Sequence, residues 1–189
     1  MKGVVGVNIK LLEVQKLKGE RVYLKRFSIL DVTQRYVDWL NDPEVNRFLS
    51  VRGIPQTIDM VREYVASYEG EKNKLLLGIF DKTNDLHIGN ITFTIIQQNG
   101  HLGIIGIAIG DKNYWRGGYA TEALNLVVNF GFSTLKLHRL EAGMSVENIA
   151  SQKLFKKAGF KQEGVLKERG KIGDRYVDDF IFGLVRNQK

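Results

Sequence analysis

The segment from Tyr114 to Ala123 places two adjacent glycines, Gly117 and Gly118, between an apolar, strand-like stretch and an amphipathic helix. At such a junction the first backbone N–H groups of the helix have no partner within it, and the positive end of the helix dipole lies beside them. Glycine also lets a ligand come close to the backbone, because it has no β-carbon. The junction therefore predicts a site for an anion such as a diphosphate.

The spacing of the glycines excludes two common nucleotide loops, since neither Gly-Lys-Ser/Thr nor Gly-x-Gly-x-x-Gly surrounds this helix. The run 115–120 instead resembles the x-x-x-Gly-x-Ala signature of the GNAT superfamily of N-acetyltransferases. Downstream, Asn148 and Ser151 followed by Gly159 and Phe160 resemble that family's Asn-x-x-Ser…Gly-Phe element. The resemblance is closest to the Rim-type branch, which includes ribosomal-protein-alanine acetyltransferases and acts on protein N-termini and other primary amines.

Length and composition agree with one cytoplasmic domain. We expect residues 1–19 to be an N-terminal extension and residues 20–186 a single GNAT domain, a suitable size for one core. The chain has no cysteine, which excludes disulfides, thiolate metal sites and a cysteine acyl-enzyme, and suits a reducing compartment. The longest apolar runs are too short to span a bilayer, so no membrane partner is expected. Three scattered histidines show no metal-site spacing, so we expect no metal.

The net charge of +7 is concentrated toward the C-terminal third, where eight basic and three acidic residues lie between Lys153 and Arg175. A basic rim near residues 148–157 suits the phosphates of coenzyme A, although a solvated surface explains it equally well. Nucleic acid is not an expected partner, because aromatic residues are not interleaved with the basic ones as stacking platforms.

Hydrophobic periodicity predicts a mixed α/β (α+β) order of elements. Asp31 and Thr57 are predicted N-caps, and Gly159 closes the last helix. The resemblance implies a central, mostly antiparallel, splayed sheet of six to seven strands flanked by about four helices. The predicted strands are 20–27, 75–81, 86–96, 103–110, 139–146, 160–167 and 176–185, and the predicted helices are 31–40, 57–68, 119–132 and 150–158.

The resemblance also implies acetyl-CoA as co-substrate. Backbone N–H groups at the glycine junction would bind its diphosphate, and the strand before the junction would pair with the pantetheine amides. Each feature also has a purely structural explanation: the glycines suit a tight turn, residues 107–109 suit a buried core strand, and Asn148 is a good N-cap. Trp115 stands where the signature often has Gln or Arg. The expected cofactor-binding residues are Ile107, Ala108, Ile109, Trp115, Arg116, Gly117, Gly118, Tyr119, Ala120, Thr121, Asn148 and Lys153.

Transfer to an amine needs a base, because a protonated amine does not attack a thioester. Many GNAT enzymes protonate the leaving thiolate with a tyrosine where this chain has Phe155, so the resemblance assigns that role to Ser151 or to a water that it holds. The strand 103–110 contains no carboxylate. Rim-type relatives carry a glutamate where Gly170 aligns, and Glu168, two residues away, is the candidate base on the same strand face. Further candidates for the base are Asp178, Asp179 and His87.

By resemblance, the first two helices and the final hairpin build the acceptor site, where Trp39, Asn41 and Tyr176 are expected to contact substrate, beside Phe48, Arg52 and Arg175. The predicted function is direct transfer of an acetyl group to a primary amine: a protein N-terminus, an amino sugar or a small-molecule amine. A non-catalytic acyl-CoA-binding or regulatory module is the alternative, and a homodimer is left open.

Overall fold

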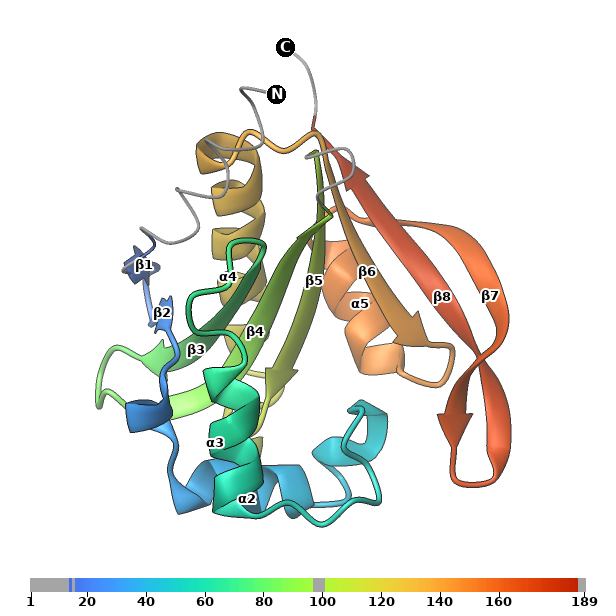
Figure 1. Cartoon of the computed structure of the whole chain (residues 1–189). Helices are drawn as coiled ribbons and strands as arrows, with labels where there is room; N and C mark the ends of the chain where they lie inside the picture. The colour runs from blue at the N-terminus through green and yellow to red at the C-terminus, as the bar shows by residue number, and fades with distance from the viewer. Residues whose placement is uncertain (1–13, 15, 97–100, 187–189) are drawn as a thin grey trace.

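One sheet with helices on both faces forms the molecule (Figure 1), and the computed structural model describes residue 14, residues 16–96 and residues 101–186. The strand order is β1-β2-β3-β4-β5-β6-β8-β7. The strands are β1 (Lys16–Lys18), β2 (Val22–Arg26), β3 (Lys74–Asp81), β4 (His87–Ile96), β5 (Leu102–Ile109), β6 (Arg139–Ser145), β7 (Lys161–Ile172) and β8 (Arg175–Val185). The helices are α2 (Gln34–Asn41), α3 (Ile58–Ala66), α4 (Tyr119–Asn129) and α5 (Ile149–Lys157), with 3-10 turns η1 (Ile29–Asp31), η2 (Asn46–Phe48) and η3 (Lys112–Tyr114) and a π-helical turn η4 (Phe130–Thr134).

This order confirms the mixed α/β fold predicted from the sequence. The sheet has eight strands where the sequence predicts six to seven, because β1 pairs with β2 at one edge. That short strand lies in the segment 1–19 expected to be an extension; the rest of the segment, apart from residues 14 and 19, lies outside the described residues, as does the predicted turn at 98–100. Among the described residues, no helix is long and apolar enough to cross a membrane.

The sheet opens between β5 and β6, its only parallel pair of neighbours in the described chain. Pairing covers Leu102 to Ile104 on β5 and Arg139 to Glu141 on β6, and then stops. Both strands continue beyond that point, β5 to Ile109 and β6 to Ser145, and diverge as the two arms of a V (Figure 1). The predicted splay is therefore present, and its two inner edges carry backbone groups without strand partners.

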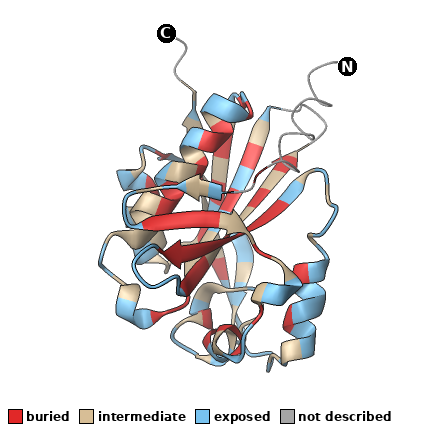
Figure 2. Ribbon diagram, turned by 90° about the vertical axis from the view of Figure 1, so that its left-hand side faces the viewer, coloured by how far each residue is buried: buried red, intermediate tan, exposed pale blue. Residues whose placement is uncertain are grey.

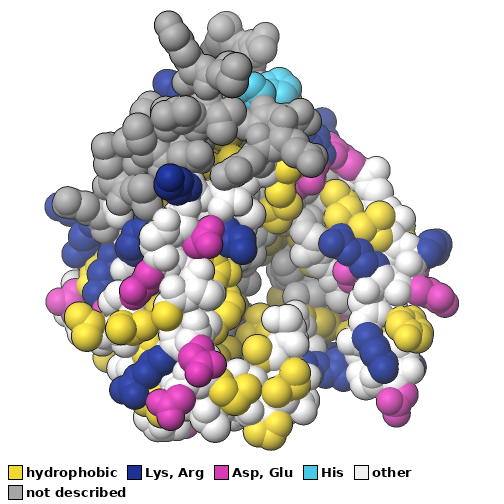
Figure 3. All heavy atoms as spheres, in the orientation of Figure 1, with side chains coloured by type: hydrophobic (Ala, Val, Ile, Leu, Met, Phe, Trp, Pro, Cys, Tyr) yellow, Lys and Arg dark blue, Asp and Glu magenta, His cyan; other side chains and the backbone are white. Residues whose placement is uncertain are grey.

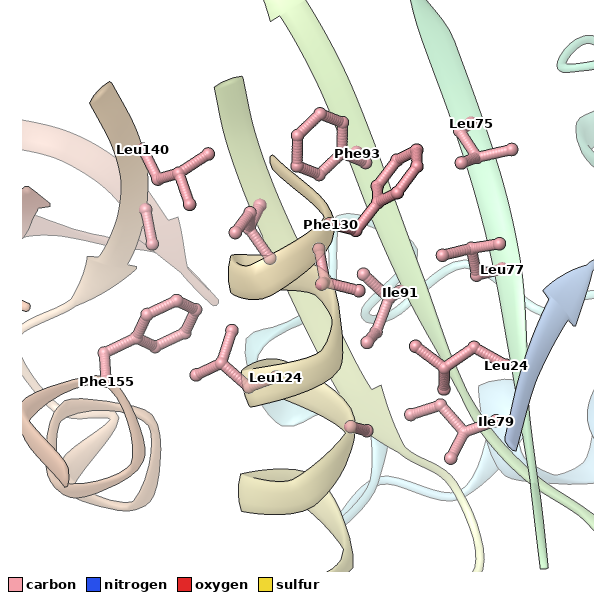
Figure 4. Packing of buried hydrophobic residues seen from close by; sticks show 14 of the residues in the cluster. Leu24, Leu75, Leu77, Ile79, Ile91, Phe93, Leu124, Phe130, Leu140 and Phe155 are labelled. Carbon is pink, nitrogen blue, oxygen red and sulfur yellow. The ribbon is translucent and has the colours of Figure 1, made fainter. Parts of the chain in front are cut away.

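Each face of the sheet has its own hydrophobic core, and buried residues concentrate along the strands and the inner sides of the helices (Figure 2). On one face, Leu124 of α4 and Phe155 of α5 point toward the side chains of the strands (Figure 4). The other face packs against α2 and α3 through a second cluster that includes Trp39, Val61 and Leu76. Burial of both faces fixes the register, since a one-residue slip of a strand would exchange its two faces.

Two of the three predicted helix caps are confirmed. Thr57 caps α3 by accepting the backbone N–H of Met60, and Gly159 follows α5 with a left-handed φ of 91°. Asp31 was the wrong choice for α2, whose N-cap is Thr33. The Asp31 carboxylate instead accepts hydrogen bonds from Ser28 and Lys25 and closes η1. Thr33, two positions after Asp31, caps α2 by accepting the backbone N–H of Tyr36. Both residues are good N-caps, so the sequence alone does not distinguish between them.

His87, one candidate for the base, is buried under α2 among aromatic rings. Its ring centroid lies 4.5 Å from that of Phe27 and 5.0 Å from that of Trp39, and Nε2 donates to the carbonyl oxygen of Gly89. Burial lowers the pKa of His87 to about 4, because the charged imidazolium loses its hydration. His87 is therefore a neutral core residue at neutral pH.

This burial predicts a loss of stability in mild acid. The folded-state pKa lies below the ordinary value of 6.5, so the unfolded chain binds more protons and stability falls as pH decreases from about 6.5 to 4. The shift corresponds to about 3 kcal/mol of unfolding free energy. Urea unfolding between pH 7 and 4.5 should show this slope in the wild-type protein and lose most of it in His87→Gln, whose amide can still donate to Gly89. An unchanged slope in that variant would rule out His87 as the cause.

Candidate functional site

At the entrance of α4, the residue before the helix has a left-handed backbone conformation that glycine adopts more easily than other residues. Gly118 is the N-cap residue, with φ of 84° and no side-chain cap. A β-carbon there would lie 3.2 Å from Nη2 of Arg21, and one at Gly117 would lie 2.9 Å from Cε2 of the Tyr119 ring. The left-handed φ favours glycine at position 118, and the Tyr119 ring leaves little room for a β-carbon at position 117.

The amide groups of this entrance are free to bind a ligand. Within the described chain, no hydrogen bond is donated by the backbone N–H groups of residues 117–121; the first one runs from Glu122 N to Gly118 O at 3.1 Å. They lie at the positive end of an 11-residue helix. Unpaired donors beside the positive end of a helix dipole are the arrangement that favours anionic groups at helix N-termini.

Two side-chain contacts anchor the loop before α4 to its neighbours. Trp115 donates its indole N–H to the carbonyl oxygen of Ile109 at 2.9 Å, which ties the loop to the end of β5. Arg35 of α2 forms an ion pair with Asp111. The Trp115 side chain thus braces the loop, and this explains why Trp fits a signature position that often holds Gln or Arg.

Ile107, Ala108 and Ile109 lie on the part of β5 that pairs with β4 and has no β6 partner. All three are half-buried. The surface is hollowed between the β3–β5 half and the β6–β8 half of the molecule (Figure 3). An extended ligand with amide groups can therefore lie against the open edge of β5 as an additional strand would. The loop that Trp115 ties to Ile109 connects this edge of β5 to the α4 entrance along the chain.

On the other arm of the V, α5 begins shortly after β6 ends. Asn148 is its N-cap, and Oδ1 accepts the backbone N–H of Ser151 at 3.1 Å. The Ser151 hydroxyl is half-buried and has no hydrogen bond to a described residue. Gln152, which the sequence did not single out, is buried and donates to Val146 O at 2.8 Å, holding the turn between β6 and α5. Lys153 is exposed on the same helix.

The sequence predicts Glu168 on the same strand face as Gly170, but a bulge in β7 separates the two residues. Between Leu166 and Gly170, β7 sets three residues against Asp178 of β8, and Glu168 has a left-handed φ of 51°. The alternation of faces is therefore interrupted, and Glu168 is exposed. Its backbone N–H donates to Asp178 Oδ1 at 2.9 Å, and the hydrogen bond from Lys167 to Asp178 lowers the pKa of that carboxyl.

Asp179 lies beside Gly170, the position where Rim-type relatives carry the glutamate. A β-carbon on Gly170 would be 3.0 Å from Asp179 Oδ1. Asp179 pairs in register with Ser145, the last residue of the splayed arm β6. The residue is half-buried, and its carboxylate makes no hydrogen bond or ion pair with a described residue. An uncommitted carboxylate thus stands beside the open end of the V.

Two of the three predicted acceptor residues have structural roles. Trp39 is 9% exposed and its ring covers Gly110, where a β-carbon would lie 2.1 Å from the ring. Asn41 exchanges two hydrogen bonds with the backbone of Gln56, 2.8 and 2.9 Å long, which close the loop between α2 and α3. Tyr176 is 64% exposed near the tip of the β7–β8 hairpin and is free to contact a substrate.

An ion-pair cluster that the sequence does not predict joins the α2–α3 loop, the β6–α5 turn and the β7–β8 hairpin. Arg47 in η2 lies 3.6 Å from one carboxylate oxygen of Glu147, and Arg175 of β8 lies 3.1 Å from the other. Glu147 directly precedes the Asn148 cap. These contacts draw the α2–α3 loop and the hairpin tip toward the open end of the V. Groups of three or more metal-ligating side chains do not occur in the described parts.

Known proteins share both this sequence pattern and this fold. Residues 21–161 match a family model described as an acetyltransferase (GNAT) domain. The chain is 31% identical over 179 residues to N-acetyltransferase p20 of Bacillus licheniformis, covering 93% of this chain and 98% of that protein. A GNAT-family acetyltransferase structure from Bacillus anthracis superposes with a TM-score of 0.80 at 24% identity, covering 90% of this chain and 98% of that one. Spermidine N-acetyltransferase from Vibrio cholerae, in complex with CoA and spermine, superposes with a TM-score of 0.78 at 19% identity, covering 88% and 96%.

Proposed function

We propose that this chain, which belongs to the GNAT family of acetyltransferases, transfers the acetyl group of acetyl-CoA directly to a primary amine within a ternary complex. The family makes it an acetyl-CoA-dependent acetyltransferase. The direct route, the acceptor and the roles of individual residues are the proposal. The cysteine-free composition suits a cytoplasmic reaction.

One observation carries the proposal for the donor side: the unpaired amides of residues 117–121 follow a loop that Trp115 ties to the end of β5, where that strand has no β6 partner. The amides would bind the diphosphate, and the backbone of Ile107–Ile109 would pair with the pantetheine arm. A thioester at the end of that arm then reaches the widening V, toward Ser151 and the β7–β8 hairpin. The neighbour from Vibrio cholerae supports the assignment, since the same fold holds CoA there.

The chemical step follows from this placement. The amine nitrogen attacks the thioester carbonyl carbon, the C–S bond breaks, and coenzyme A leaves as a thiolate. Ser151 would return a proton to that sulfur. The proton lost by the amine passes to a carboxylate of the β7–β8 arm, where Glu168 is exposed and Asp179 lies beside the V. A backbone N–H on the open edge of β5 would stabilise the tetrahedral oxyanion.

The acceptor class is proposed to be a protein N-terminus, an amino sugar or a small-molecule amine. Tyr176 and Arg175 on the hairpin and Arg47 in η2 border the region where it would enter. Thiol release from acetyl-CoA, measured against a panel of peptides, amino sugars and amines, tests the activity. Tight acetyl-CoA binding without turnover on any amine would instead favour a non-catalytic acyl-CoA-binding module.

With the best acceptor of that panel, we expect Ser151→Ala to lower kcat about tenfold to a hundredfold or more, as removal of a proton donor does. Its dissociation constant for CoA should stay at the wild-type value, because the diphosphate site is untouched. Ser133→Ala, in η4 at the far end of α4, is the matched control. Equal kcat values for Ser151→Ala and Ser133→Ala would exclude Ser151 as the donor.

A further inference from the structure

Arg21, which immediately precedes β2, reaches the α4 entrance from the opposite end of the chain. Its Nη1 donates to the carbonyl oxygen of Gly117 at 2.8 Å, and its Nε donates to Glu122 at 3.1 Å. The guanidinium lies 4.7 Å from the centre of the Tyr119 ring. One side chain therefore contacts the loop, the first helical turn and the ring that covers the loop.

The bond to Gly117 has a consequence for the next amide. In a planar trans peptide the C=O of one residue and the N–H of the next point in opposite directions. The described chain contains no cis peptide. Because the Gly117 carbonyl points to Arg21, the N–H of Gly118 points to the other side, where it has no protein partner.

This peptide plane needs an external restraint. It joins two glycines, which reach more backbone conformations than any other residue pair, so the plane can turn over at low cost. Arg21 fixes its orientation, and Glu122 in turn fixes Arg21. The Glu122 carboxylate also accepts the backbone N–H groups of Arg21 and Val22, at 2.8 and 3.1 Å.

Glu122 remains charged in this arrangement. Its burial alone would raise the pKa, but hydrogen bonds from the backbone N–H groups of Val22 and Arg21 and from the guanidinium lower it below the ordinary value. A charged carboxylate holds the guanidinium more strongly than a neutral one would. The restraint is therefore present throughout the neutral pH range.

We propose that Arg21 is a positioning residue for coenzyme A: it locks the Gly117–Gly118 peptide so that the Gly118 N–H faces the diphosphate. The inference rests on acetyl-CoA being the co-substrate of this chain. Arg21 is 45% exposed at its side chain, and its Nη2 has no hydrogen bond to a described residue.

The test compares CoA, 3′-dephospho-CoA and pantetheine, of which only the first two contain the diphosphate. Calorimetry should show that Arg21→Ala weakens CoA and 3′-dephospho-CoA by the same factor, about tenfold to a hundredfold, the effect of one charge-assisted hydrogen bond. Pantetheine, titrated by NMR at millimolar concentration, should bind both proteins equally. Arg62→Ala, which removes an arginine paired with Asp59 on α3, controls for lost charge and should bind all three ligands as the wild type does.

Arg21→Lys separates locking from simple charge. A single ammonium cannot reproduce the fork that holds Gly117 and Glu122 together, so its CoA affinity should fall nearly as far as that of Arg21→Ala. This variant also serves if Arg21→Ala does not fold. Wild-type CoA affinity in either variant, or an equal loss for pantetheine, would overturn the inference. No CoA affinity in the wild-type protein would instead contradict the proposed function.

Discussion

Replacing Gly118 with valine is expected to weaken CoA binding by about a hundredfold or more. A β-branched residue at φ of 84° is a strong conformational outlier, and its β-carbon would lie 3.2 Å from Arg21 Nη2. The loop can relieve this only by turning the Gly117–Gly118 peptide or displacing Arg21. Either change misdirects the amides that bind the diphosphate, and each charge-assisted bond lost costs about 1.5–3 kcal/mol. Calorimetry with CoA measures the effect.

Gly70→Val is the matched control for backbone strain. Gly70 has a similar φ of 75°, and a β-carbon there would meet nothing within 4 Å. Both variants should therefore lose stability, by about 1–2 kcal/mol from the left-handed conformation alone. Only Gly118→Val should lose CoA affinity. Equal CoA affinities in the two variants would show that the α4 entrance does not hold the diphosphate.

Phe155→Ala is expected to lower the free energy of unfolding by about 3–5 kcal/mol, more than any other substitution proposed for this protein. Phe155 is 2% exposed, stacks edge-on against Phe160 with ring centroids 5.0 Å apart, and points toward Leu124 of α4 (Figure 4). Its removal leaves a cavity between α5 and α4. Since domains are typically stable by only about 5–15 kcal/mol, the variant should unfold at a much lower urea concentration.

Ile149→Ala provides the comparison within the same helix. Ile149 is 53% exposed at the first turn of α5, so its truncation should change the unfolding free energy by less than about 0.5 kcal/mol. A loss below 1 kcal/mol for Phe155→Ala would mean that α5 does not pack as described. The Ser151 end of that helix would then lack the support on which the site depends.

The local parts of this structure could be predicted from the sequence. Gly117 and Gly118 identify the α4 entrance because the requirement for glycine is a property of neighbouring residues. Thr57 and Gly159 identify helix ends for the same reason. Apolar runs bounded by turn residues predict β3, β4 and β5, because strands of a sheet that is covered on both faces are rich in apolar residues throughout.

Contacts between distant residues could not be predicted in this way. Arg21 meets Gly117 across 96 positions, and Arg175 meets Glu147 across 28, and no local pattern marks either pair. The bulge at Glu168 changed the face of a residue whose strand was otherwise correctly predicted. Trp39 resembled a substrate contact in sequence, but its ring fills the space over Gly110. Long-range packing decides all of these cases.

The proposed function depends on the free amides of residues 117–121 binding the diphosphate of acetyl-CoA. This binding can be followed by titrating the ¹⁵N-labelled protein with CoA and recording its amide chemical shifts. We predict saturable shifts concentrated in the amides of residues 117–121, with a second set along residues 107–109 of β5. Saturable binding whose shifts leave residues 117–121 unchanged would contradict the account.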